Sequence, residues 1–294
     1  MPTAEAGLRL TFKNILLPID FTSASVAALG YARALAADYD SRIFVTHAIT
    51  PNPPIFLPME PIPIDLDAEW HDAQQQLEKF LNLSALKGTR HEGILERGEI
   101  WNVLDDVVRR HSIDLIVLGS HGKHGLKKLV LGSAAERIFR QADCPVLTAG
   151  PRVVSPVGDE IAFKHILFAT DFSAGSLRAL PYAISLAEEN QARLALLHVT
   201  TLVPEQLKAR VVANAKQRLQ ELIPAEAENW CHAAPVESFE FPTEGILHVA
   251  EAEGTDLIVM GVHRRTPVAS SHLPWAIAYE VVSHAHCPVL TVRG

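Results

Sequence analysis

Glycines in the first half of this 294-residue chain are spaced in a way that suits anion binding. Gly119-Ser120-His121-Gly122 directly follows an apolar segment, and Gly132-Ser133 follows further along the chain. Residues without a Cβ let the backbone turn tightly and present its N–H groups. A helix beginning at Gly132-Ser133 would add N-terminal N–H groups that favour an anion. The spacing predicts a phosphate cradle that is neither a Walker A loop nor the GxGxxG of a dinucleotide fold.

A carboxylate stands at the end of an earlier apolar segment, in Pro18-Ile19-Asp20-Phe21. Asp20 is poorly suited to phosphate because like charges repel. It is better suited to hydrogen-bonding a sugar hydroxyl or an adenine amine, or to assisting a metal. Lys123, Lys127 and Lys128 lie between the two glycine clusters, where they could screen phosphate charge or form a solvated basic loop.

The chain is a duplication. Lys13–Phe21 aligns with Lys164–Phe172, and this alignment continues without a gap to His47 over His198. Later in each half, Asp114–Gly119 matches Asp256–Gly261, and Cys144–Thr148 matches Cys287–Thr291. We therefore expect two domains, residues 1–150 and 160–294, with a short linker-like junction from Gly150 to Phe163 that contains two prolines and two glycines.

The second copy has lost most of the cradle. Gly261 remains, but Arg264 replaces the second glycine, and Trp275 with Ala276 aligns with Gly132-Ser133. A tryptophan at a helix N-terminus fills space that a phosphate would need. The sequence thus predicts one nucleotide site, in the first half. Arg264 and Arg265 leave open the binding of another anion in the second half.

Apolar segments of strand length alternate with longer amphipathic segments. In the first half the expected strands are Ile15–Ile19, Ile43–Ala48, Gly93–Glu96, Leu115–Gly119 and Val146–Ala149, and the expected helices are Ser23–Asp38, Ala68–Leu86, Ile100–His111 and Ser133–Gln141. Strands that are apolar throughout, separated by helical crossovers, imply a parallel sheet covered on both faces. Each half should be a doubly wound, five-stranded α/β domain.

Such sheets bind ligands beyond the carboxyl ends of the strands, where the strand order reverses. If the first and fourth strands are neighbours there, Asp20 and both glycine clusters converge on one crevice. Val26, Leu29 and Ala36 are spaced to face the core, and Thr22 or Ser23 is a candidate helix N-cap. Pro51–Pro63, with six prolines, is expected to form an extended loop.

Composition narrows the function classes. The net charge of −8 argues against a general nucleic-acid binder, since that affinity comes from clustered Lys and Arg. Neither a secretory signal nor a run long enough for a membrane span is visible. Three cysteines without CxxC spacing make a disulfide framework unexpected, which fits a cytoplasmic location.

Several other residues invite chemical roles. His121 could act as an acid or base, although packing within its loop is the simpler expectation. His47 and His198 occur in both halves, including the one without the glycines, which predicts a structural role. His284-Ala285-His286-Cys287 could bind zinc, but its histidines have no counterparts in the first half, so Cys287 is expected to be a buried thiol. We expect no metal site.

These residues resemble a known family. Ile15–Phe21, the Gly119–Gly122 loop with Gly132-Ser133, and Cys144–Leu147 make the chain similar to tandem universal stress proteins over nearly all of both halves. The resemblance implies an adenine nucleotide alpha hydrolase-like fold that binds ATP, with Mg²⁺ as an accompanying ion, in the first half. It also implies that the two fifth strands pair across a pseudo-twofold axis, with further pairing of two chains left open.

The resemblance further implies site residues. Adenosine would be contacted by Pro18, Ile19, Asp20 and Ala48. The phosphates would be held by Gly119, Ser120, His121, Gly122, Gly132, Ser133 and Ala134. One departure is Ala135, where ATP-binding relatives often carry a hydroxyl residue.

The leading hypothesis is an ATP-binding, nucleotide-dependent stress-response regulator with little or no catalysis. An adenylate-forming enzyme is an alternative, but such enzymes usually carry a glycine-containing phosphate loop where this chain has Asp20–Ser23. A weak ATPase also stays open. A third alternative is a scaffold whose second half binds a different small anionic or lipid-like ligand.

Overall fold

The computed structural model describes residues 10–50, 66–119, 132–153, 161, 163–200, 204–227, 231–236, 241–262 and 274–294. The Pro51–Pro63 segment, most of the glycine loop and the lysines that follow it lie outside these residues. The elements of the first half are β1 (Asn14–Pro18), α1 (Ser23–Tyr39), β2 (Arg42–Ile49), α2 (Leu66–Leu81), β3 (His91–Arg97), α3 (Ile100–Arg110), β4 (Leu115–Gly119), α4 (Ser133–Gln141) and β5 (Val146–Ala149).

The second half repeats this order. Its elements are β6 (His165–Ala169), α5 (Ala174–Leu177), α6 (Leu180–Asn190), β7 (Arg193–Val199), α7 (Glu205–Gln220), β8 (Cys231–Val236), α8 (Pro242–Ala252), β9 (Leu257–Val262), α9 (Pro274–His284) and β10 (Val289–Arg293). The helix that corresponds to α1 is divided into α5 and α6. Pro181, which stands where the first half has Gly30, lies in the first turn of α6. A proline cannot donate to the preceding turn and clashes with its carbonyl, which accounts for the division.

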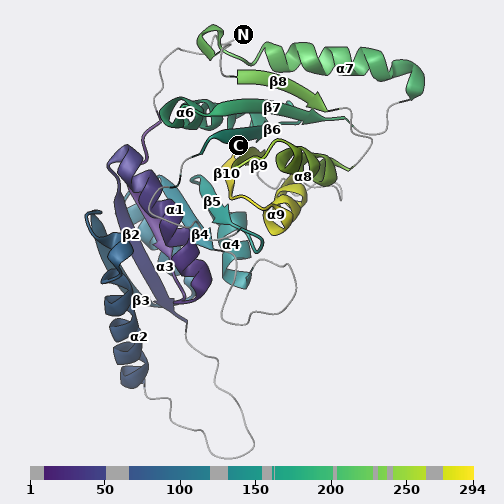
Figure 1. Ribbon diagram of the computed structural model, residues 1–294. Coiled ribbons are helices and arrows are strands. Elements are labelled where there is room, and N and C mark those ends of the chain that lie inside the picture. Colours follow the sequence, from purple (N-terminus) through teal and green to yellow (C-terminus); the bar gives the residue numbers. More distant parts are fainter. Residues whose placement is uncertain are drawn as a thin grey trace, which may run out of the picture.

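One ten-stranded sheet runs through both halves, in the order β3-β2-β1-β4-β5-β10-β9-β6-β7-β8. Pairing within each half is parallel, and β5 pairs with β10 antiparallel at the junction. Figure 1 shows the two halves on either side of this junction. The predicted tandem α/β fold, with two doubly wound parallel units and paired fifth strands, is confirmed.

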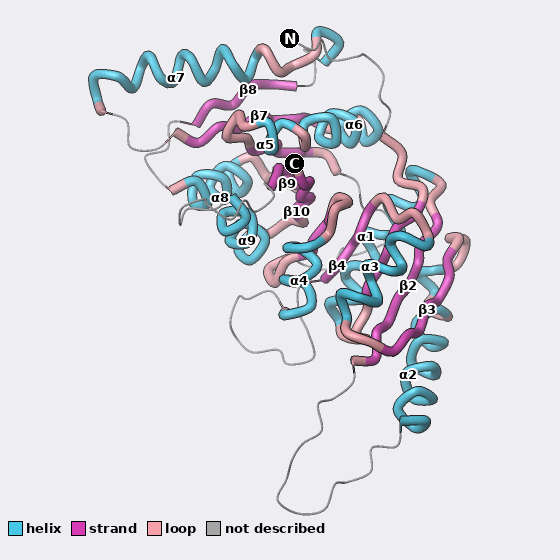
Figure 2. The backbone as a smooth tube through the Cα atoms, turned by 180° about the vertical axis from the view of Figure 1, so that it is seen from behind, coloured by secondary structure: helices cyan, strands magenta, loops and turns pink. Residues whose placement is uncertain are grey.

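Helices cover both faces of the sheet. One buried cluster joins the sheet to α1, α2, α6 and α7, and the other joins it to α3, α4, α8 and α9. Figure 2, the view from behind, shows α2 beside β3 and α7 beside β8 at the two ends of the sheet. Because each cluster contains residues from both halves, the two repeats share their cores.

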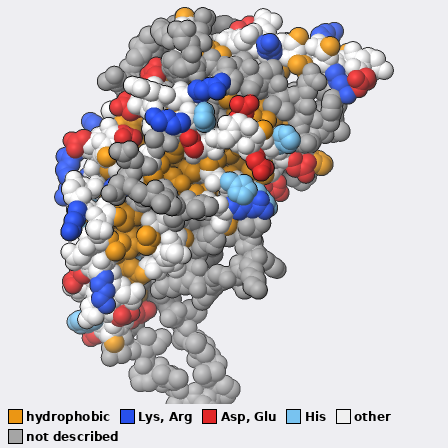
Figure 3. All heavy atoms as spheres, in the orientation of Figure 1, with side chains coloured by type: hydrophobic (Ala, Val, Ile, Leu, Met, Phe, Trp, Pro, Cys, Tyr) orange, Lys and Arg blue, Asp and Glu red, His pale blue; other side chains and the backbone are white. Residues whose placement is uncertain are grey.

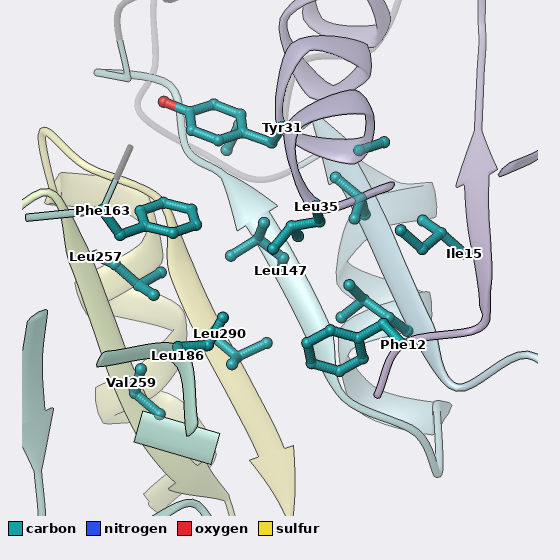
Figure 4. Close-up of a cluster of buried hydrophobic side chains, with 14 of the residues drawn as sticks. Phe12, Ile15, Tyr31, Leu35, Leu147, Phe163, Leu186, Leu257, Val259 and Leu290 are labelled. Carbon is teal, nitrogen blue, oxygen red and sulfur yellow. The ribbon is translucent and has the colours of Figure 1, made fainter. Parts of the chain in front are cut away.

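The junction between the halves is built from equivalent residues. Leu147 of β5 pairs with its counterpart Leu290 of β10, and both are buried. Phe12 stacks on Tyr182 at 6.3 Å between ring centroids, and Phe163 stacks on Tyr31 at 6.5 Å. These two contacts exchange the same pair of positions between the repeats, as an isologous interface does. Figure 4 shows Phe12, Tyr31 and Phe163 near Leu147 and Leu290 at this junction.

Charge is mixed on the visible surface. In Figure 3, acidic and basic side chains are interspersed around a central hydrophobic area of the described residues. None of the helices within the described ranges is long and apolar enough to cross a membrane.

Two sequence-based expectations about helices were wrong. Val26, expected in the core, is 51% exposed, because the buried face of α1 is centred on Ala28, Ala32 and Leu35 and Val26 lies beyond its edge. The expected helix Ala68–Leu86 ends at Leu81, and a separate 3₁₀ turn covers Ser84–Leu86. At the end of α2 the backbone N–H and the side-chain amide of Asn82 both donate to the Glu78 carbonyl.

Candidate functional site

The strand order of the first half reverses between β1 and β4, as the predicted site requires. These strands are parallel neighbours, with Ile15 paired to Leu115 and Leu16 to Ile116. Their carboxyl ends, Pro18 and Gly119, therefore lie side by side at one edge of the sheet. Neighbouring β2 pairs Thr46 with Pro18 and extends to Ile49, which brings Ala48 to the same edge.

Asp20 shapes the loop that leaves this edge. Its Oδ1 accepts hydrogen bonds from the Thr22 N–H at 3.0 Å, the Thr22 hydroxyl at 2.5 Å and the Ser25 hydroxyl at 2.8 Å. The contacts that Asp20 makes through its carboxylate with described residues thus fall on Oδ1. Thr22 is the N-cap residue of α1, as expected, but it acts in this network and not by bonding the helix N–H groups.

The second half repeats this loop. Asp171 Oδ1 accepts from the Ser173 N–H at 2.9 Å and also from the Ser173 hydroxyl. Asp and Ser or Thr side chains commonly close turns in this way. Both aspartates therefore have a structural role at the helix entrance, whatever else Asp20 binds.

A strained phenylalanine follows each aspartate. Phe21 has φ 64° and Phe172 has φ 62°, left-handed values that are uncommon for a bulky residue. Their rings lie 4.4 Å from His47 and 4.5 Å from His198, centroid to centroid. Each histidine uses Nδ1 to bond a backbone carbonyl at 2.8 Å, of Ile19 in one half and Thr170 in the other. The histidines hold the ends of the strands together, as expected of structural residues.

The glycines at the ends of β4 and β9 are required by packing. A Cβ on Gly119 would lie 2.3 Å from the Ala24 carbonyl oxygen, and a Cβ on Gly261 would lie 2.4 Å from Ser176 Cα. Neither glycine has positive φ. The close approach of α1 to Gly119, and of α5 to Gly261, accounts for the survival of Gly261 in the half that has lost the other glycines.

The remaining predicted phosphate ligands lie at the start of α4. Gly132 is its N-cap residue, with φ −56° and ψ 150°, and Ser133 and Ala134 open the helix. This end lies at the edge of the sheet where β4 ends, because α4 returns the chain to the start of β5. Ala135 is buried in the core behind it. Ser120, His121 and Gly122, and the side chain of Ser133, lie outside the described residues.

The other end of α4 is held by the second half. Arg293, from β10, donates hydrogen bonds to the carbonyls of Arg140 and Gln141 and lies 3.8 Å from the Asp143 carboxylate. A cation at a helix C-terminus is favourable because it interacts with the exposed carbonyls. Sequence reasoning missed this contact, which joins positions about 150 residues apart.

The equivalent crevice of the second half is a cavity of about 110 Å³. It lies at the ends of β6, β7 and β9, against α8 and α9. The alignment of Cys144 with Cys287 places Ile277 where the first half has Ala134, and Ile277 lines this cavity. Trp275 is in the first turn of α9, as expected, but its side chain lies outside the described residues.

The other reactive side chains have structural surroundings. Burial raises the pKa of both Cys144 and Cys287 to about 12. His284 bonds the Glu280 carbonyl through Nδ1 at 2.9 Å. Among the residues that the structure describes, no group of His, Cys, Asp or Glu could hold a metal ion. On α3, Arg109 and Arg110 form ion pairs with Asp105 and Asp106, one helical turn away.

Comparison with known proteins identifies the family of the chain. The sequence model of the universal stress protein family matches residues 11–149 and, a second time, 162–293. The chain belongs to the universal stress protein family. A universal stress protein of Mycobacterium tuberculosis is 25% identical over 96% of this chain and 97% of its own length. One from Methanocaldococcus jannaschii is 32% identical over 46% of this chain and 81% of its own length.

The fold comparison agrees with this assignment. A crystal structure of a universal stress protein from Archaeoglobus fulgidus matches with a TM-score of 0.68 at 19% identity, covering 95% of this chain and 98% of that chain. The fold of this chain is therefore shared over nearly its full length.

Proposed function

We propose that the first half, residues 1–150, binds ATP and that its nucleotide state controls association with partner proteins, with little or no turnover. The observation that carries the proposal is the glycine N-cap of α4, located at the edge of the sheet where the strand order reverses. The free N–H groups and positive end of a helix dipole attract an anion. Family membership adds support, because universal stress proteins commonly bind ATP.

The nucleoside would lie over the ends of β1 and β2. Pro18, Ile19 and Ala48 would supply its apolar contacts, and Asp20 could accept a sugar hydroxyl through Oδ2. The phosphates would then point toward Gly132, Ser133 and Ala134, with Gly119, Ser120, His121 and Gly122 as the facing loop. A Mg²⁺ ion would accompany the phosphates. We also infer that residues 160–294 form an altered repeat without ATP.

A titration that compares ATP with adenosine tests the cradle. Gly132→Val fits the extended backbone at this N-cap but places a branched side chain where the phosphates would lie. We expect it to weaken ATP binding by tenfold or more in isothermal titration calorimetry and to leave adenosine affinity nearly unchanged. Phe241→Val is the matched control, since Phe241 is an exposed N-cap residue with φ −65° and ψ 151° in the second half.

An unchanged preference for ATP over adenosine in Gly132→Val would remove the cradle from the proposal. Turnover measured on the same samples separates a binder from an enzyme: phosphate release well above buffer controls would favour the ATPase alternative. The thiols of Cys144 and Cys287 are free, which suits action in a reducing cytoplasm.

A further inference from the structure

The second crevice offers a small ligand an apolar enclosure with a few polar groups. Its volume of about 110 Å³ is smaller than an apolar cavity of about 150 Å³ that binds benzene, but the pocket is open on one side and so gives a ring further room. Ile246 of α8, Met260 of β9 and Ile277 of α9 form much of the apolar wall. The polar wall comes from the loop after β6 and the end of β7, through Thr170, Asp171, Ser176 and His198.

The wall is unsuited to phosphate. Ile277 stands at the position of Ala134, so a branched apolar side chain occupies the start of the helix that would otherwise hold an anion. Asp171, in the loop after β6, also lines the cavity, and its carboxylate repels negative charge. Among the described residues that line this cavity there is no Lys or Arg side chain to compensate an anionic ligand for its lost hydration.

The polar groups of the wall accept more readily than they donate. The Thr170 carbonyl can only accept, so His198 Nδ1 carries the proton and the Nε2 of the neutral ring is an acceptor. The Thr170 and Ser176 hydroxyls bond each other at 2.8 Å, and Ser176 also donates to the Ser173 carbonyl. A ligand that complements this wall therefore brings its own hydrogen-bond donor, a role that an N–H group fills.

We propose that the second crevice binds a small phosphate-free ring compound that is apolar over most of its surface and carries an N–H donor. The two repeats would then bind two chemically different ligands, and the second site does not depend on whether the first binds ATP. The second crevice keeps the strand ends and the loop geometry of the first site. It differs at the start of α9, where Ile277 replaces the residue that would face a phosphate in the first half.

Indole is a suitable probe because it joins an apolar fused ring to a single N–H group. We expect its addition to the full chain to shift the methyl NMR signals of Ile246, Met260 and Ile277 saturably. Benzofuran has nearly the same shape but an oxygen in place of the N–H. It should bind several-fold more weakly, in line with the loss of one hydrogen bond. Indole-3-acetate should also bind more weakly, because its carboxylate meets Asp171.

A variant locates the site. Ile277→Trp should fill the cavity and weaken indole binding by tenfold or more, and Ile277→Phe should do so to a smaller extent. Val26→Trp, at an exposed position of the first half, is the control and should bind indole like the parent chain. Absence of saturable shifts at the three methyl-bearing residues would overturn the proposal, as would full affinity in a folded Ile277→Trp chain. Equal affinity for benzofuran, or tighter binding of indole-3-acetate, would overturn the assigned ligand chemistry.

Discussion

Gly119 and Gly261 illustrate how one residue can have two explanations. A glycine before a proposed phosphate loop is readily assigned to the ligand, yet Gly119 lies against the backbone of α1 and Gly261 against that of α5. We expect Gly119→Ala and Gly261→Ala each to lower the free energy of unfolding by about 1–3 kcal/mol, because the added Cβ overpacks this contact. Urea denaturation followed by circular dichroism measures the change. If Gly261→Ala left the free energy of unfolding unchanged, the close approach of the helix would not explain why a glycine is present at this position.

The thiols of Cys144, which is partly buried, and Cys287, which is buried, give a second prediction at the residue scale. A pKa of about 12 leaves the thiols of Cys144 and Cys287 protonated at pH 8, with a thiolate fraction of roughly one in 10⁴. Since the thiolate is the nucleophile, both residues should resist iodoacetamide in the folded chain and react fully in urea. Peptide mapping by mass spectrometry distinguishes the sites. Rapid native labelling of either residue would contradict its burial.

At the scale of elements, α4 connects the proposed nucleotide to the second half. Its first residues face the proposed phosphates, and its last carbonyls accept hydrogen bonds from Arg293 of β10. Arg293→Ala should lower the free energy of unfolding by about 1–2 kcal/mol, because hydrogen bonds from a charged donor are lost at a largely buried site. Amide hydrogen exchange in α4 should quicken.

Arg109→Ala is the comparison for that variant. It removes an exposed ion pair within α3, where the expected effect is below about 0.5 kcal/mol. If the two substitutions destabilise the chain equally, Arg293 does not act as a cap for α4. Arg293→Lys should restore only part of the stability, since a lysine cannot reach two carbonyls with a planar group.

At the scale of the whole molecule, the junction is almost self-complementary. Leu147 pairs with its own counterpart, and the Phe12–Tyr182 and Phe163–Tyr31 contacts exchange equivalent positions. Residues 1–153 expressed alone should therefore form a dimer through β5, because the exposed strand can pair with a second copy of itself. Light scattering after size-exclusion chromatography measures the mass. Leu147→Glu should give a monomer or an unfolded chain, and a monomeric parent fragment would refute the expectation.

Much of this architecture was predictable from the sequence. The predicted bounds of β4, β5 and α4 match the observed ones. These elements are short, and turn residues delimit them sharply in the sequence. The exposure of Val26 was not predictable, since it depends on how far the buried face of α1 extends. The cap of α4 by Arg293 depends on packing between distant segments and left no local pattern.

The candidate site was predictable in part. Alignment of the halves brought out Asp20, His47 and the glycines, and the structure places Pro18, Ala48, Gly119 and Gly132 at one edge of the sheet. The left-handed Phe21 and the hydrogen bond from Ser25 were missed. The Asp-Phe pair recurs in each half and marks the turn, but the serine bond differs between the halves, because Ser176 bonds Thr170 and Ser173. The ligand itself lies beyond what either copy's pattern specifies.

Joining β5 to β10 within one chain has an evolutionary consequence. In a dimer of identical subunits every substitution appears twice, so both crevices must change together. Here a mutation reaches one copy alone, and the continuous sheet keeps the partner copy folded while its neighbour diverges. Covalent fusion thus frees one pocket to specialise without loss of the ancestral one.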